Sequence, residues 1–239
     1  GVFRHQKINP KVGDKVLGEN NTIVKILPRK NDLIRPFVSN VDKALIVTSL
    51  VEPDLNLNLL DRIIANVEFN DIKAVLIFSK ADLVRDINEY DEVLKYYKSI
   101  GYNIYLLPND ANLIKEEIQD NICVLAGQSG VGKSTFVNLL SNLNIKTDSI
   151  SKALGRGKHT TRHTELLKIE NGWIADTPGF GTLELDMTEI DLSHSFVEFF
   201  ETKCKFNGCL HLNEPGCNVK NKVQNNEIMK SRYDNYLSF

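Results

Sequence analysis

Just past its midpoint the chain reads Gly127-Gln128-Ser129-Gly130-Val131-Gly132-Lys133-Ser134, and this stretch decides its fold. The stretch matches the pattern G-x-x-x-x-G-K-[ST], in which a glycine-rich loop wraps the phosphates of a nucleoside triphosphate. The apolar run Ile122–Ala126 before it is typical of a buried parallel strand, and residues 134–140 after it predict a helix. A strand, a glycine-rich turn and a helix in this order predict a phosphate-binding loop in an α/β fold.

Within this loop the residue types suit phosphate oxygens and Mg²⁺. Glycines let several backbone N–H groups point inward, and Lys133 supplies a positive charge for the β- and γ-phosphates. The Ser134 hydroxyl is placed to ligate Mg²⁺. We therefore expect the nucleotide phosphates to be bound by Gly127, Gln128, Ser129, Gly130, Val131, Gly132, Lys133, Ser134 and Thr135.

Two further segments downstream suit a γ-phosphate and its metal ion. Asp176-Thr177-Pro178-Gly179 ends an apolar stretch, so Asp176 is expected to hold Mg²⁺ through water and the Gly179 N–H to sense the γ-phosphate. An Asp-x-x-Gly alone is usually just a turn, but its position after the phosphate loop strengthens the interpretation. Between them, residues 155–164 are predicted to form a switch loop in which Thr160 or Thr161 closes on Mg²⁺; the alternative is a solvated basic loop.

A candidate guanine-reading segment, Ser79-Lys80-Ala81-Asp82, follows the apolar run Lys73–Phe78. The Asp82 carboxylate is able to accept hydrogen bonds from the guanine N1–H and exocyclic amine, a pair that adenine does not donate. The usual pattern is Asn-Lys-x-Asp, and here Ser79 replaces the asparagine. Taken alone the segment is more often a surface turn. Because it precedes the phosphate loop in the chain, the sequence predicts a circularly permuted GTPase core.

A second constellation lies in the last third of the chain: Cys204, Cys209, His211 and Cys217. Three thiols and one imidazole are enough to fill a closed tetrahedral Zn²⁺ site, which we expect to be structural. The alternatives are a disulfide, disfavoured by the odd number of clustered cysteines, and unrelated buried thiols. Cys123, in the run before the phosphate loop, is expected to be a small core residue.

Together these motifs resemble the RsgA (YjeQ/YloQ) family of circularly permuted GTPases over nearly the whole chain. The matching blocks are Val12-Gly13-Asp14, Arg29-Lys30-Asn31, residues 79–83, the phosphate loop, residues 157–161, residues 176–180 and the stretch 204–217. The resemblance implies an N-terminal OB domain, a permuted GTPase domain and a zinc-containing helical domain. It also implies GTP hydrolysis to GDP and phosphate, with Mg²⁺, stimulated by the small (30S) ribosomal subunit during its late maturation.

On this basis we divide the 239 residues into a partial OB-type β segment (1–34), the permuted GTPase domain (35–185) and a zinc-binding helical domain (186–239). The first segment holds only the latter part of an OB barrel, and since the chain opens at Gly1 we leave open that this domain is truncated. No apolar run reaches membrane-spanning length, and we expect a cytoplasmic monomer.

The expected partners are the 30S subunit and its 16S rRNA, although a net charge of −2 is not typical of an RNA-binding protein. Basic residues are instead local, and each is either a phosphate contact or a solvated side chain: Arg156, Lys158, Arg162, Lys203, Lys205, Lys220, Lys222, Lys230 and Arg232.

Phe180 stands where many GTPases have a water-positioning glutamine, which predicts slow intrinsic hydrolysis. We expect His159 to position the attacking water, as proposed for the corresponding family histidine; contact with phosphate or RNA is the equal alternative. The competing function is an RNA-associated or ribosome-binding scaffold that retains nucleotide mainly for structure.

Overall fold

The computed structural model describes residues 9–20, 22–33, 37–141, 166–176 and 185–239, and of Asp176 only the backbone. Its centre is a six-stranded sheet with the order β7-β6-β5-β8-β10-β9. All neighbouring strands are parallel except β9, which runs antiparallel to β10. In sheet order the strands are Asn103–Leu106 (β7), Lys73–Ser79 (β6), Lys43–Ser49 (β5), Ile122–Ala126 (β8), Gly172–Asp176 (β10) and Leu166–Ile169 (β9).

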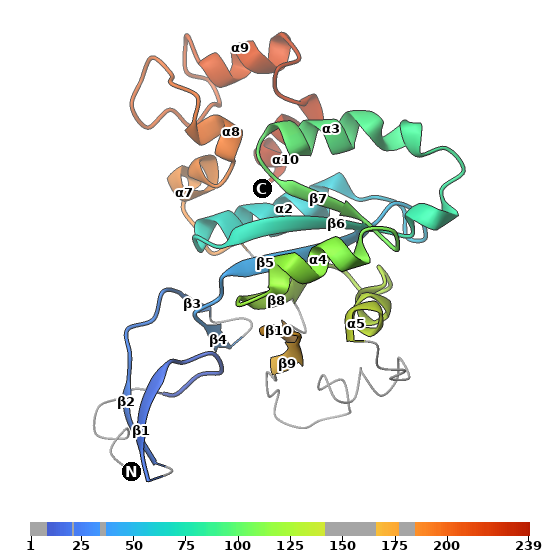
Figure 1. Cartoon of the computed structure of the whole chain (residues 1–239). Coiled ribbons are helices and arrows are strands. Elements are labelled where there is room, and N and C mark those ends of the chain that lie inside the picture. The colour runs from blue at the N-terminus through green and yellow to red at the C-terminus, as the bar shows by residue number, and fades with distance from the viewer. Residues whose placement is uncertain (1–8, 21, 34–36, 142–165, 177–184) are drawn as a thin grey trace.

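Helices cover both faces of this sheet (Figure 1). Side chains alternate along β6: Leu76 and Phe78 pack under α2 (Leu57–Phe69) and α3 (Asp91–Ser99), while Val75 and Ile77 face the other layer. That second layer consists of α4 (Ala111–Ile118) and α5 (Lys133–Ser141). Since both faces are buried, the strands read as near-continuous apolar runs rather than alternating ones.

The sheet order confirms the predicted circular permutation. Strand β8, which leads into the phosphate loop, lies between β5 and β10. Its neighbours on one side come from earlier in the chain and those on the other side from later. The guanine segment at the end of β6 therefore precedes the phosphate loop in sequence but shares its sheet.

The N-terminal part contributes an antiparallel hairpin of β1 (Val16–Glu19) and β2 (Thr22–Ile26), and a short pair of β3 (Asp32–Leu33) and β4 (Val38–Ser39). Strand β1 begins only at Val16, although apolar residues occur from Val12 onward. The reason is Gly13, whose φ of 88° turns the chain. A Cβ atom built on Gly13 would lie 2.1 Å from the Ser39 carbonyl oxygen, so only glycine fits there. Val12 is left with an isolated bridge to Val38.

Two helices begin later than the apolar pattern predicts. The apolar residues begin at Leu55, but α2 starts at Leu57, because the Asn56 side chain accepts from the Leu59 N–H and caps the helix. Helix α3 begins only at Asp91, because a 3₁₀ turn, η2 (Ile87–Tyr90), precedes it. A second 3₁₀ turn, η1 (Ala81–Leu83), carries the guanine segment.

The C-terminal part is helical, as expected, and consists of α7 (Glu189–His194), α8 (Val197–Phe200), α9 (Asn218–Gln224) and α10 (Lys230–Ser238). It packs on the α2 side of the sheet (Figure 1). Its core contains Phe196, Phe199 and Tyr236 together with Ala65 of α2. Ser195 caps the C-terminal end of α7, and α8 covers only four residues.

Candidate functional site

The predicted nucleotide-binding residues gather at one edge of the sheet. Ser79 ends β6, Gly127 follows β8 and Asp176 ends β10. These strands are parallel to one another across β5, so their carboxyl ends meet at the same edge. This is where open α/β sheets bind ligands.

The phosphate loop adopts a backbone conformation that requires its glycines. Gly127 adopts a φ of 132°, and a Cβ there would lie 2.1 Å from the Val47 carbonyl oxygen. The loop then leads into α5, which begins at Lys133. The Lys133 ammonium donates to the carbonyl oxygens of Gly127 (2.7 Å) and Gln128 (2.6 Å), so it lies over the loop. Ser134 is half-buried and Thr135 exposed.

The guanine segment is anchored by its first two residues. Ser79 is buried and its hydroxyl donates to the Val131 carbonyl at 2.6 Å. Lys80 takes a left-handed backbone conformation (φ 59°), and its ammonium donates to the Glu52 carbonyl. Asp82 is exposed in η1, where its carboxylate is accessible to a base.

The loop after β7 lies beside this segment. The Ala81 N–H donates to the Leu107 carbonyl at 3.1 Å. Asp110 stabilises the turn after β7, because its carboxylate accepts from the Leu106 N–H at 2.7 Å. The loop after β7 is therefore held next to the guanine segment.

Sequence reasoning missed residues 50–54, which follow β5 at the same edge. The Leu50 N–H donates to the Ser79 carbonyl at 3.2 Å, and the Ser49 hydroxyl donates to the Pro53 carbonyl at 2.6 Å. A Cβ placed on Gly130 would lie 3.9 Å from Pro53 Cδ, so this segment borders the phosphate loop. No sequence motif marks residues 50–54. The only indication in the sequence was that they follow a strand, β5, that ends at this edge of the sheet.

The remaining predicted residues of this site, His159, Thr160, Thr161 and Gly179, lie outside the described residues. The backbone of Asp176 is described: it is the last residue of β10 and pairs with Leu125, two residues before Gly127. The chain therefore brings Asp176 to the phosphate-loop edge, as its position after an apolar stretch predicted.

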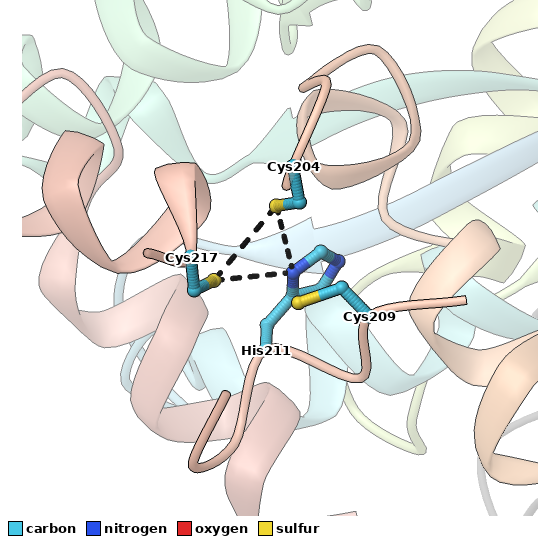
Figure 2. A group of neighbouring side chains, drawn as sticks. All are labelled: Cys204, Cys209, His211 and Cys217. Atoms are coloured by element: carbon cyan, nitrogen blue, oxygen red, sulfur yellow. Dashed lines mark hydrogen bonds between the residues drawn. The ribbon is translucent and has the colours of Figure 1, made fainter. Parts of the chain in front are cut away.

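The four predicted zinc ligands converge on one point (Figure 2). The Cys204 Sγ lies 3.6 Å from His211 Nδ1 and 3.9 Å from the Cys217 Sγ, which is 3.4 Å from the same nitrogen. Cys209 completes a set whose ligand atoms all lie within 4.8 Å of one another. A tetrahedral Zn²⁺ with its usual bond lengths requires sulfur–sulfur and sulfur–nitrogen separations of roughly 3.8 and 3.6 Å. The residues therefore fit a zinc ion.

The pKa values of the four ligands shift in different directions: burial raises the pKa of the Cys209 and Cys217 thiols, whereas those of His211 and Cys204 are lowered. Burial lowers the pKa of His211, which favours the neutral imidazole that binds metals. At Cys204 burial opposes ionisation, but backbone N–H groups of Val219 and Asn218 outweigh it and hold the thiol pKa below its usual value. All four cysteines of the chain are free thiols, which removes the disulfide alternative. Cys123 is a buried core residue of β8, as expected.

The loop that carries these ligands is held by side chains from its own turn and from α10. The Glu214 carboxylate accepts from the N–H groups of Leu210 (2.7 Å) and Leu212 (2.8 Å). The Tyr233 hydroxyl donates to the His211 carbonyl at 2.6 Å. Such contacts around the ligands orient them toward the metal.

Comparison with known proteins agrees with this architecture. The family model described as RsgA GTPase matches residues 26–186, more than half of the chain. The Small ribosomal subunit biogenesis GTPase RsgA of Bacillus subtilis is 45% identical over 255 residues, covering 100% of this chain and 86% of the relative. The protein named Small ribosomal subunit biogenesis GTPase RsgA 1 from Listeria monocytogenes is 46% identical, covering 99% and 86%.

Two solved structures are similar over the whole chain. YloQ, titled a circularly permuted GTPase, superposes with a TM-score of 0.82 at 39% identity, covering 99% of this chain and 82% of the other. YjeQ from Thermotoga maritima gives 0.84 at 34% identity, covering 100% and 86%. With the permuted sheet and the phosphate loop in place, these matches show that the chain belongs to the RsgA family of circularly permuted GTPases.

Proposed function

We propose that this GTPase hydrolyses GTP to GDP and phosphate during late maturation of the small (30S) ribosomal subunit, and that the subunit stimulates its turnover. The observation that carries the proposal is the meeting of the phosphate loop and the guanine segment at one edge of the permuted sheet. Full-length relatives that bear the name small ribosomal subunit biogenesis GTPase support the choice of partner.

In this proposal the chain binds the two ends of GTP with different residues. The loop N–H groups and Lys133 hold the phosphates, and Asp82 accepts hydrogen bonds from guanine. Ser134, Asp176 and one of Thr160 and Thr161 would hold Mg²⁺, which neutralises charge on the β- and γ-phosphate oxygens when it is bound. The Gly179 N–H senses the γ-phosphate in the same scheme.

Water attacks the γ-phosphorus and the bond to the β–γ bridging oxygen breaks, so charge develops on the departing GDP. Lys133 stabilises that charge. His159 orients the attacking water, because Phe180 offers no hydrogen-bonding group at the position where many GTPases have glutamine. Because Phe180 makes intrinsic hydrolysis slow, catalysis in this proposal is completed by another group or by the ribosome.

The remaining parts of the chain are assigned to metal binding and to contacts with the ribosomal subunit. We assign Cys204, Cys209, His211 and Cys217 to one structural Zn²⁺, since four protein ligands leave no open position. We keep the division at residues 1–34, 35–185 and 186–239, with 16S rRNA contacted by local basic residues of a cytoplasmic monomer. Within the described ranges, no helix has the length and apolar character needed to cross a bilayer.

The scaffold alternative is not favoured, because the chain belongs to a GTPase family and keeps its loop lysine over the phosphate loop. The deciding experiment is phosphate release from GTP and from ATP, with and without purified 30S subunits. Stimulated release from GTP alone supports the proposal. Tight subunit binding without stimulated release would overturn it in favour of the scaffold.

A further inference from the structure

The last helix of the zinc-bearing part, α10, is fastened to one end of α2 (Figure 1). The Asn58 amide donates to the Asn235 Oδ1 at 3.1 Å and to the Ser238 Oγ at 3.0 Å. One turn further along α2, Asp61 accepts from the Asn235 amide at 2.6 Å and from Arg232 at 2.7 Å. These polar contacts of α10 therefore fall on the first two turns of α2.

The same end of α2 is joined to the segment that borders the phosphate loop. Residues 50–56 connect β5 to α2, and the Asn56 side chain caps the helix. The Ser49 hydroxyl donates to the Pro53 carbonyl at 2.6 Å, and a Cβ built on Gly130 would lie 3.9 Å from Pro53 Cδ. A short, internally bonded segment thus separates the contacts of α10 from the phosphate loop.

The structure between these two points is packed on both sides. Leu60 and Ile64 of α2 are buried in the core that the helix forms with the sheet. The Tyr90 hydroxyl donates to the Leu50 carbonyl at 3.0 Å and holds the beginning of the segment. Because closely packed interiors transmit displacements instead of absorbing them, a shift of α10 also shifts residues 50–56.

We infer that Asn58 is a positioning residue, which together with Asp61 couples α10 to residues 50–56 and so to the phosphate loop. Nucleotide bound in that loop then stabilises the docking of α10, and by thermodynamic reciprocity a firmly docked α10 strengthens nucleotide binding. This inference rests on the proposed binding of GTP and GDP. It gives a 30S subunit that contacts the C-terminal helices a route to the phosphate loop.

Hydrogen exchange of the α10 amides, measured on the zinc-loaded protein with and without GDP, tests the coupling. In the wild type we expect GDP to slow exchange in α10 about fivefold or more, since this is the usual size of a coupling between two sites. In Asn58→Ala the slowing should fall to about twofold or less, because the variant loses the two hydrogen bonds nearest to residues 50–56.

Asn66→Ala is the matched control. Asn66 is also a half-buried asparagine of α2, but it lies near the other end of the helix, where its side chain accepts from Asn70 at 3.3 Å. This variant should keep the wild-type slowing. Thermal unfolding verifies that the variants fold. Ser238→Ala removes one of the same hydrogen bonds from the side of α10, and it carries the test if Asn58→Ala does not fold.

The second readout is phosphate release from GTP at increasing concentrations of 30S subunits. Asn58→Ala should lower the maximal stimulated rate about threefold or more. The subunit concentration that gives half of the stimulation should not change, because Asn58 acts through α10 and not by contacting the subunit. A residue with a merely structural role would lower the melting temperature and leave this maximal rate unchanged.

Three results would overturn the inference: exchange in α10 of the wild type that does not respond to GDP, equal slowing in Asn58→Ala and the wild type, or an unchanged maximal rate in Asn58→Ala. An equal loss of slowing in Asn66→Ala would also count against it, since any change in α2 would then have the same effect. Failure of the wild-type protein to bind GDP would instead refute the proposed function, and a direct binding measurement shows this separately.

Discussion

Arg232 of α10 and Asp61 of α2 form an ion pair that is wholly inside the protein: neither side chain is exposed, and Nη1 lies 2.7 Å from Oδ1. The guanidinium also donates to both oxygens of Glu198, at 2.8 and 3.0 Å. Asp61 further accepts from the Tyr97 hydroxyl (2.5 Å). Because every charge has partners, the cluster fixes the C-terminal helices on α2, and Arg232 is not available to RNA as its basic character had suggested.

Replacing Arg232 with methionine should reduce the free energy of unfolding by about 3–5 kcal/mol, because two carboxylates stay buried without their cation. Urea unfolding measures this change. Lys230→Met is the matched control, since Lys230 lies on the same helix and pairs with Asp234 while 77% exposed. That change should cost less than about 1 kcal/mol. Equal effects of the two substitutions would contradict a buried pair that holds the domains together.

The zinc content of the protein should depend on the four clustered side chains and not on the total number of cysteines. We expect about one Zn²⁺ per chain by atomic absorption, lost in Cys217→Ala and retained in Cys123→Ala, whose thiol belongs to the sheet core. Chelation should lower the melting temperature of the wild-type protein, because metal binding to the folded state contributes to its stability. Zinc retention in Cys217→Ala would show that the cluster is not the binding site.

The ionisation of Asp14 makes the free energy of unfolding depend on pH. Burial opposes its ionisation, but bonds from Arg29, the Lys11 N–H and Ser39 prevail and lower its pKa from 3.8 to about 2. Because the folded pKa is depressed, this contribution of about 2 kcal/mol is fully present above pH 4 and is lost as the pH falls toward 2.

The measurement is the difference in urea stability between wild type and Asp14→Asn at several pH values. It should be constant from pH 7 to about pH 5 and shrink below pH 4. Asp91→Asn is the control, because that carboxylate is 43% exposed in a surface pair with Lys95. A difference that grows on acidification would refute the assignment.

Asp82→Asn should change the base preference of the nucleotide site from guanine to xanthine. The asparagine amide still accepts from N1–H, but it donates to the base position where guanine carries an amine, so GTP affinity should fall roughly 100-fold or more. Xanthine has an oxygen there, and xanthosine triphosphate binding should improve. Asp86→Asn removes the same charge nearby while preserving the cap on Asn88, and it should leave both affinities unchanged.

His159→Ala should keep GTP affinity and lose the stimulation of hydrolysis by 30S subunits, because the histidine is assigned to the attacking water and not to binding. His163→Ala, in the same segment, should retain stimulation. The measurement is phosphate release at saturating GTP with subunits present. Unchanged stimulation in His159→Ala would remove the histidine from the proposed mechanism.

The phosphate loop, the strand before it and the metal cluster could be predicted because each is a short stretch whose residue types carry the chemistry. The sequence indicated β8 as Ile122–Ala126, and the structure has the same bounds. Helix starts were less predictable, since capping by Asn56 competes with the apolar pattern on either side.

By itself the sequence determined the class of fold, the permuted motif order and the four side chains able to hold zinc, because local spacing and residue chemistry are readable along the chain. Only the tertiary structure decided that Ser79 reaches Val131, that residues 50–54 border the phosphate loop, and that Arg232 meets Asp61 from 171 positions away. Such contacts depend on how helices and strands pack, and packing brings together residues whose separation along the chain carries no periodic signal.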